Sequence, residues 1–259
     1  MMMKGDVRID IPESVRNMLV RNAERYETRD FVVGDPSWFM HQVEGDRNRE
    51  AMAFVASCLS YGSRQQFMPK IDFLLQSCGG EMHDWIASGA FAEVLREGCI
   101  DCFYRLYTVG AFHSFLSAYQ RLMQRHGSLG EYVRGRAATG YEAVVAICDY
   151  FAGEGVSVIV PRDATSACKR VCMFLRWMVR DGSPVDIGLW ADFIDRRTLI
   201  MPLDTHVLQQ AERLGLLASR TASMSAARRL TAALAEVFPD DPLRGDFALF
   251  GYGVNGGEA

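Results

Sequence analysis

Residues 166–180 read SACKRVCMFLRWMVR, and this stretch decides the fold class. Its apolar side chains recur three and four residues apart, as on one face of an α-helix: Val171, Phe174, Leu175 and Met178. Lys169 comes at the start of this helix, near the edge of the apolar face. The spacing therefore predicts a helix that packs into a core and carries a lysine in its first turn.

The same periodicity continues along the chain and predicts an all-α fold. We expect helices at residues 12–26, 47–61, 63–76, 84–96, 99–106, 111–126, 140–153, 165–180, 186–194, 204–214, 223–237 and 243–252. VSVIVP at 156–161 is the best strand candidate, but it ends in proline, so we expect an extended linker there. A chain of 259 residues, 49% of them hydrophobic, suits one helical domain of two lobes over residues 1–259.

The first residues, MMMKGDVRIDIPESV, contain no apolar stretch of signal-peptide length. Apolar runs elsewhere are short and interrupted by arginine, glycine or aspartate, which is too short for a membrane span. We therefore expect a cytoplasmic protein with no membrane partner.

The seven cysteines are an odd number, which argues against a disulfide framework or a disulfide-linked partner. Cys99 and Cys102 form one CxxC, which suits half of a zinc site, a redox pair or two buried thiols on a helix. Because no second CxxC exists, buried thiols are favoured and no metal site is expected. Cys168 and Cys172 are expected to fill the core.

The net charge of −4 is not that of an obvious nucleic-acid-binding protein. Residues 162–229 nevertheless carry a net charge of +4, which leaves −8 for the remainder. This asymmetry fits a basic face in the second half of the chain, or only an uneven helical surface.

Lys169 is one of three lysines in the chain. A helix N-terminus disfavours a positive charge, and partial burial lowers the pKa of an amine. Both effects favour the neutral amine that Schiff-base chemistry needs. The alternative is a surface lysine whose aliphatic stem covers apolar atoms.

Asp204 lies in LIMPLDTHVLQQAERLGL at 199–216, directly before an amphipathic helix that Gly215 is expected to end. An aspartate at this place suits the N-cap of that helix. A carboxylate at a helix start beside a cleft can also be catalytic. His206 follows two residues later, where a packed or hydrogen-bonded histidine is the commoner case.

Three motifs resemble an uncharacterised bacterial family that is defined only as a domain of unknown function: SACKRVCMFLRWMVR (166–180), IMPLDTHV (200–207) and DDPLRGDFALFGYGVN (240–255). The resemblance extends from AMAFVASCLSYGSRQQF (51–67) onward. It specifies a family but implies little about function.

A more distant resemblance concerns the helix-hairpin-helix base-excision DNA glycosylases. LDTHVLQQAERLGL is similar to their aspartate segment, and Lys169 followed by FLR at 174–176 is similar to the lysine segment of the 8-oxoguanine glycosylases. The resemblance implies a two-lobed helical fold, a catalytic segment at 162–216, Lys169 as nucleophile and Asp204 as catalytic carboxylate. It implies damaged duplex DNA as partner, with these binding residues: Thr165, Ser166, Arg170, Arg176 and His206.

The chain departs from those glycosylases in three ways. Its turn before the lysine, RDATSAC at 162–168, contains no glycine, so hydroxyls of Thr165 and Ser166 would have to replace part of the phosphate grip. Lys169 and Asp204 are 35 residues apart, a longer separation than in those enzymes. No C-terminal four-cysteine cluster exists, so neither an iron–sulfur cluster nor another cofactor is expected.

Three functions follow as hypotheses. The first is a DNA glycosylase with associated lyase activity that excises an oxidised base such as 8-oxoguanine. The alternative is a non-catalytic nucleic-acid-binding or adaptor protein on the same fold. A third is an enzyme that acts on a free nucleoside or nucleotide with the same lysine and carboxylate. The sequence leaves the oligomeric state open.

Overall fold

The computed structural model describes residues 11–254 and shows the all-α fold that the sequence predicts. The α-helices are α1 (Glu13–Tyr26), α2 (Asp46–Leu59), α3 (Arg64–Cys78), α4 (Met82–Ser88), α5 (Val109–His126), α6 (Leu129–Arg134), α7 (Gly140–Gly153), α8 (Lys169–Val179), α9 (Thr205–Arg213), α10 (Met224–Ala235) and α11 (Arg244–Val254). Short 3-10 helices are η1 (Arg29–Val32), η2 (Pro36–His41), η3 (Ala90–Glu93) and η4 (Arg196–Thr198). Strands β1 (Cys102–Tyr104) and β2 (Tyr107–Thr108) pair in antiparallel fashion.

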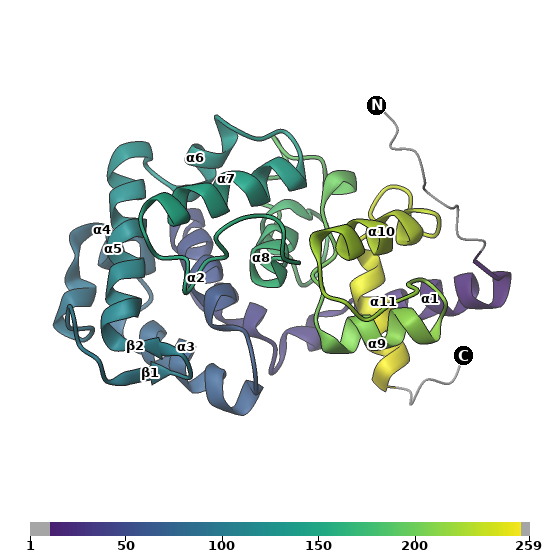
Figure 1. The fold of residues 1–259 in the computed structure, drawn as a ribbon, viewed down its shortest axis with the longest axis horizontal. Coiled ribbons are helices and arrows are strands. Elements are labelled where there is room, and N and C mark those ends of the chain that lie inside the picture. The colour runs from purple at the N-terminus through teal and green to yellow at the C-terminus, as the bar shows by residue number, and fades with distance from the viewer. Residues whose placement is uncertain (1–10, 255–259) are drawn as a thin grey trace.

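The helices form two groups with α8 between them (Figure 1). One group contains α2 to α7 and the two strands, and the other contains α1, α9, α10 and α11. The first and last helices, α1 and α11, pack side by side, and α11 also packs against α9. Segments from both ends of the chain therefore build the second group.

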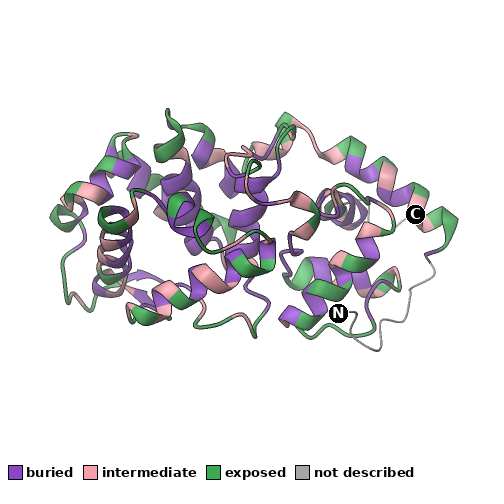
Figure 2. Ribbon diagram, turned by 90° about the horizontal axis from the view of Figure 1, so that it is seen from above, coloured by how far each residue is buried: buried purple, intermediate pink, exposed green. Residues whose placement is uncertain are grey.

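Helix α8 is the central element, because α2 and α7 both pack against it. Every residue from 171 to 179 is buried, so the burial is wider than the one apolar face that the periodicity predicts. The buried stretch includes Arg176, whose charge needs partners inside the fold. Figure 2 shows how buried residues concentrate on the inward sides of the helices.

The helix predicted at 99–106 is wrong, since this segment forms the hairpin of β1 and β2. Aromatic and β-branched residues favour a strand here, and Arg105 has a φ of +50° in the connecting turn. The expectation of two buried thiols on a helix fails with it. Cys99 is only partly buried, and Cys102 is exposed.

The helix predicted at 186–194 is also wrong, because these residues form turns against the end of α8. The amides of Ile187 and Gly188 donate to the carbonyl of Trp177, and the amide of Trp190 donates to Met178. The last carbonyls of a helix have no partner within it. The segment satisfies them, and its amides are then unavailable for a helix of their own.

The segment at 156–161 stays outside the sheet but is not the extended linker that we expected. The amide of Ile159 donates to the carbonyl of Val156 at 3.0 Å, which makes a turn. Helix α6 lies in a stretch for which the periodicity predicted no helix. Its N-cap Ser128 accepts a hydrogen bond from the amide of Glu131 at 3.2 Å, so a capping residue rather than a long apolar face defines it.

Glu50 fastens α2 to α6 inside the first group of helices. Its carboxylate accepts hydrogen bonds from the amides of Leu129 (2.9 Å) and Gly130 (3.1 Å) and from Nε1 of Trp190 (3.0 Å). Burial raises the pKa of Glu50, and these three donors oppose that rise. Within residues 11–254 no helix is long and apolar enough to cross a membrane.

Candidate active site

Lys169 is the first residue of α8, as the sequence predicts for the helix start. The residue before it, Cys168, has left-handed backbone angles (φ +44°, ψ +37°), and its carbonyl accepts from the amide of Cys172 at 2.9 Å. A residue other than glycine is uncommon in this region. The turn at 162–168 thus reaches a glycine-type conformation without a glycine and places Lys169 next to the residue that follows α2.

The amine of Lys169 is held by backbone. Its Nζ donates to the carbonyl of Ser60, the residue that follows α2, at 3.3 Å. The side chain is half-buried. Among residues 11–254 no carboxylate forms an ion pair with this amine within 4.0 Å. A hydrogen bond to a neutral carbonyl fixes the position of the amine without requiring its charge.

Burial lowers the pKa of Lys169, and this is the largest influence on it. The charges of Asp204, Asp246 and Asp35 act in the opposite direction, in that order of strength. Arg64, which pairs with Asp35 at 3.3 Å, adds a smaller lowering effect. The charge of the amine is therefore disfavoured by burial and favoured by this cluster of three carboxylates.

Asp204 is the N-cap of α9, which is the structural role that its place in the sequence favours. Its Oδ1 accepts from the amide of Val207 at 2.9 Å, and the residue is exposed. Of the carboxylates that influence Lys169, Asp204 has the largest effect. Asp204 thus belongs to the carboxylate cluster whose charges act on Lys169, and it is itself exposed to solvent.

Asp246 is a member of this cluster that the sequence did not single out for it. It lies in the first turn of α11 and forms an ion pair with Arg176 of α8. Burial raises its pKa, Arg176 opposes this most strongly, and the charge of Asp204 raises it further. The available signal was Arg176 itself, because an arginine inside an apolar helix face requires a carboxylate partner. The sequence does not indicate which aspartate is the partner of Arg176.

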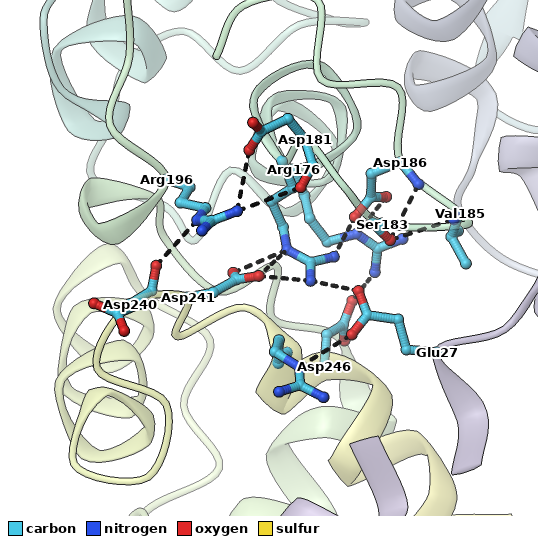
Figure 3. A network of polar contacts seen from close by, with 12 residues as sticks. Glu27, Arg176, Asp181, Ser183, Val185, Asp186, Arg196, Asp240, Asp241 and Asp246 are labelled. Carbon is cyan, nitrogen blue, oxygen red and sulfur yellow. Dashed lines mark hydrogen bonds and ion pairs between the residues drawn. The ribbon is translucent and has the colours of Figure 1, made fainter. Parts of the chain in front are cut away.

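Arg176 belongs to a larger buried network that joins α8 to α1 and α11 (Figure 3). Asp186 bonds both Arg176 (Nε–Oδ1 3.3 Å) and Arg180, and Arg180 also bonds Asp241 and Glu27. The side chains of Arg176, Arg180 and Asp186 are each at most 4% exposed. This network fixes α8, the helix that begins with Lys169, relative to α1 and α11.

Arg170, the residue after Lys169, contacts both the end of α2 and the hairpin. Its Nη1 donates to the carbonyl of Cys58 at 2.8 Å and to the hydroxyl of Tyr107 in the hairpin. Its guanidinium also lies 5.2 Å from the ring centre of Tyr61. Burial raises the pKa of Tyr107 despite the nearby Arg170 charge, so this hydroxyl stays protonated. Arg170 thus ties the hairpin to the end of α2.

The remaining expected binding residues lie at different depths. Thr165 and Ser166 are exposed, and the Thr165 amide donates to Oδ1 of Asp163 at 2.9 Å. His206 is exposed in the first turn of α9. Arg176 is buried in the network. Cys168 and Cys172 are buried, as expected.

Two of the protein's cavities are not lined by the candidate residues. One is lined by residues at the C-terminal end of α8 and in the turns that follow, including Val179, Asp181 and Arg196. The other lies beside Glu50, Arg134 and Trp190. Neither is lined by Lys169 or Asp204. Within residues 11–254 no group of three or more potential ligands is arranged to hold a metal ion.

The fold and site define an all-α protein with one partly buried lysine in a carboxylate cluster. The chain belongs to the family described as "Protein of unknown function (DUF2400)", whose model matches residues 35–255. This range includes Lys169, Asp204 and Asp246. Comparisons with curated proteins and with solved structures gave no match.

Proposed function

We propose that this protein is a DNA glycosylase of the helix-hairpin-helix type that uses Lys169 as a Schiff-base nucleophile. The supporting observation is the Lys169 amine itself, which is desolvated at a helix start and held by the Ser60 carbonyl. A lysine is nucleophilic only when neutral, and desolvation favours the neutral form. Together with the resemblance to the 8-oxoguanine glycosylases, this environment favours imine chemistry over a purely structural lysine.

In the proposed reaction a damaged base leaves the duplex stack, and its sugar comes to lie beside Lys169. Asp204 stabilises the positive charge that develops on the sugar as the glycosidic bond breaks. Nζ of Lys169 bonds to C1′ of the sugar, and the electron pair of the broken glycosidic bond leaves with the base. One nitrogen proton then passes to the departed base, the C1′–O4′ bond breaks with its electron pair going to O4′, and the second nitrogen proton passes to O4′, which leaves the imine between C1′ and Nζ.

Borohydride trapping tests the proposal. The full chain is incubated with duplexes that carry 8-oxoguanine, other oxidised bases or an abasic site, and a reduced covalent complex is expected on at least one of them. Lys169→Gln abolishes it. Lys70→Gln is the matched control and should trap as the wild type does, because Lys70 lies on α3 and packs its amine 5.4 Å from the Phe103 ring centre. Absence of trapping on the whole panel would refute the proposal.

One observation favours the non-catalytic alternative. Arg170 and Arg176, two of the expected binding residues, use their guanidinium groups inside the fold. A protein that only binds nucleic acid would show salt-dependent affinity without base release. Measuring binding and base release on the same duplexes at two salt concentrations separates the two functions.

A further inference from the structure

We propose that the exposed side of α10, together with the turn at 162–168, binds the phosphate backbone of duplex DNA, with Arg228 and Arg229 as the charged contacts. The inference deepens the proposed function and rests on it for the identity of the partner. It has three supports in the structure: a direct contact between the turn and α10, a stripe of exposed side chains along α10, and two arginine charges that the described part of the fold does not neutralise.

The turn at 162–168 and the start of α10 are in direct contact. The amide of Met224, the first residue of α10, donates to the carbonyl of Thr165 at 3.3 Å. Thr165 and Ser166 are exposed, and the turn leads directly into Lys169. The exposed hydroxyls of the turn therefore lie beside the start of α10, immediately before the proposed nucleophile in the chain.

The exposed residues of α10 recur three and four positions apart, which places them along one side of the helix. They are Ser225, Arg228, Arg229 and Ala232. The other side is buried and holds α10 in the fold. Nη1 of Arg229 donates to Oγ of Ser225, one turn earlier, at 2.8 Å. Its guanidinium therefore extends toward the start of α10, where the turn at 162–168 makes its contact.

Arg228 extends the same surface toward α7. Its guanidinium carbon lies 5.2 Å from the ring centre of Tyr141, the second residue of α7. The ring is 38% exposed, so this contact lies at the surface. Because tyrosine is a neutral side chain, it holds the guanidinium in position and leaves its positive charge in place.

The two arginines carry charges that no described carboxylate neutralises. Residues 213–235 contain no Asp or Glu. Within residues 11–254 neither Arg228 nor Arg229 forms an ion pair, whereas the neighbouring Arg220 pairs with Glu212. The positive charge that the sequence carries in this part of the chain is thus partly gathered on one exposed surface.

This combination of groups suits a phosphate backbone. Arginine side chains and Ser or Thr hydroxyls are among the groups that contact DNA phosphates, and such contacts hold the duplex in register without reading its sequence. Two adjacent positive charges without a carboxylate also favour a polyanion as the partner. DNA bound along α10 and the turn would lie beside the segment that carries Lys169.

The first measurement is the affinity of the full chain for a short undamaged duplex at several salt concentrations, by fluorescence anisotropy. No base release or covalent chemistry is involved. Each lost phosphate contact reduces the slope of log affinity against log salt by about 0.9. The double variant Arg228→Ser/Arg229→Ser should therefore lose about 1.8 of the slope, and about tenfold or more of the affinity at about 0.1 M salt.

Two variants control for charge and for shape. Arg21→Ser/Arg25→Ser removes the same net charge from exposed positions one turn apart on α1, and it should keep the wild-type slope. Arg228→Lys/Arg229→Lys keeps both charges on α10 and should keep most of the slope. If the α10 arginines served only solubility, the two serine variants would bind DNA alike.

The second measurement needs no substitution, so it holds even if a variant does not fold. The wild type is modified with the arginine reagent phenylglyoxal, with and without the duplex, and each arginine is followed by mass spectrometry. Arg228 and Arg229 should lose most of their modification when DNA is present, while Arg21 and Arg25 react as before.

The outcomes separate this inference from the proposed function. An unchanged slope in Arg228→Ser/Arg229→Ser, or equal modification of Arg228 and Arg229 with and without DNA, overturns the inference and leaves the glycosylase standing. A wild type that binds no duplex overturns it as well. Absence of borohydride trapping with a normal slope and with protection of both arginines refutes the glycosylase alone and supports this surface.

Discussion

Arg180 grips Asp241 with two nitrogens: Nε lies 2.9 Å from Oδ1, and Nη2 lies 2.8 Å from Oδ2. Arg180 directly follows α8 and Asp241 precedes α11, so this pair joins the helix that begins with Lys169 to α11. The same guanidinium reaches Glu27 after α1 at 2.6 Å. One side chain therefore holds three segments that are far apart in the sequence.

We expect Arg180→Met to lower the free energy of unfolding by about 3–5 kcal/mol, because it leaves buried carboxylates without their partner. Urea unfolding followed by circular dichroism measures the loss. Arg196→Met is the control, since Arg196 and its partner Asp181 are 40% and 64% exposed. An exposed pair contributes at most about 1 kcal/mol. Equal losses in the two variants would show that the buried Arg180 network contributes no more to the free energy of unfolding than an exposed ion pair.

Glu27 should make the protein sensitive to acid. Burial raises the pKa of this carboxyl, but the charge and hydrogen bonds of Arg180, with smaller contributions from Ser183 and Arg244, outweigh it and lower the pKa. A lowered folded-state pKa stabilises the fold above the ordinary glutamate pKa of about 4.3, and this contribution is lost as the pH falls below it. Glu27→Gln lacks the contribution at every pH.

The test is the difference in unfolding free energy between the wild type and Glu27→Gln at pH 7 and at decreasing pH below 4.5. We expect the wild type to be more stable at pH 7 and the difference to shrink as the pH falls. A difference that stays constant with pH would contradict the lowered pKa of Glu27.

Periodicity located most helices of this fold because their apolar faces are regular. It failed at 99–106 and 186–194 for a physical reason that spacing does not contain. In the first, aromatic residues and the turn at Arg105 favour a hairpin. In the second, backbone amides satisfy the carbonyls of Trp177 and Met178 across a turn. Both outcomes depend on partners that are set by tertiary structure.

The sequence predicted only part of the candidate site, for a similar reason. Local features placed Lys169 at a helix start and Asp204 at an N-cap, and the structure has both. Asp246 pairs with Arg176, which is 70 residues away in the sequence, and local spacing does not contain such a pairing. The left-handed backbone conformation of Cys168 could not be predicted from the sequence either, since cysteine does not favour that conformation.

Gly130 allows α6 to approach α2 closely. A Cβ at this position would lie 2.6 Å from Oε2 of Glu50 and 2.8 Å from Nε1 of Trp190. Both atoms are hydrogen-bonded to each other and buried, so neither can move without losing its partner. We expect Gly130→Ala to destabilise the protein by about 1–3 kcal/mol, as overpacking does.

Gly153→Ala is the matched control for that substitution. Gly153 is the last residue of α7, and a Cβ there would meet no atom within 4 Å. Alanine favours a helix over glycine, so this variant should be as stable as the wild type or more stable by up to about 1 kcal/mol. Thermal unfolding of both variants decides the matter. A Gly130→Ala variant as stable as Gly153→Ala would mean that α6 does not need the close approach.

Lys169→Met should separate function from stability. Burial lowers the pKa of Lys169, so the charged amine penalises the folded state below the ordinary lysine pKa of about 10.4. Methionine removes this penalty and keeps most of the side-chain volume, at the loss of one hydrogen bond to Ser60. We therefore expect a melting temperature equal to or above that of the wild type at pH 7, with a difference in melting temperature that decreases as the pH rises toward about 10.4.

Covalent trapping on DNA should vanish in the same variant. If Lys169 had only a structural role, Lys169→Met would instead lower the melting temperature and leave trapping unaffected. Structural residues stabilise the folded protein, whereas active-site residues can reduce its stability.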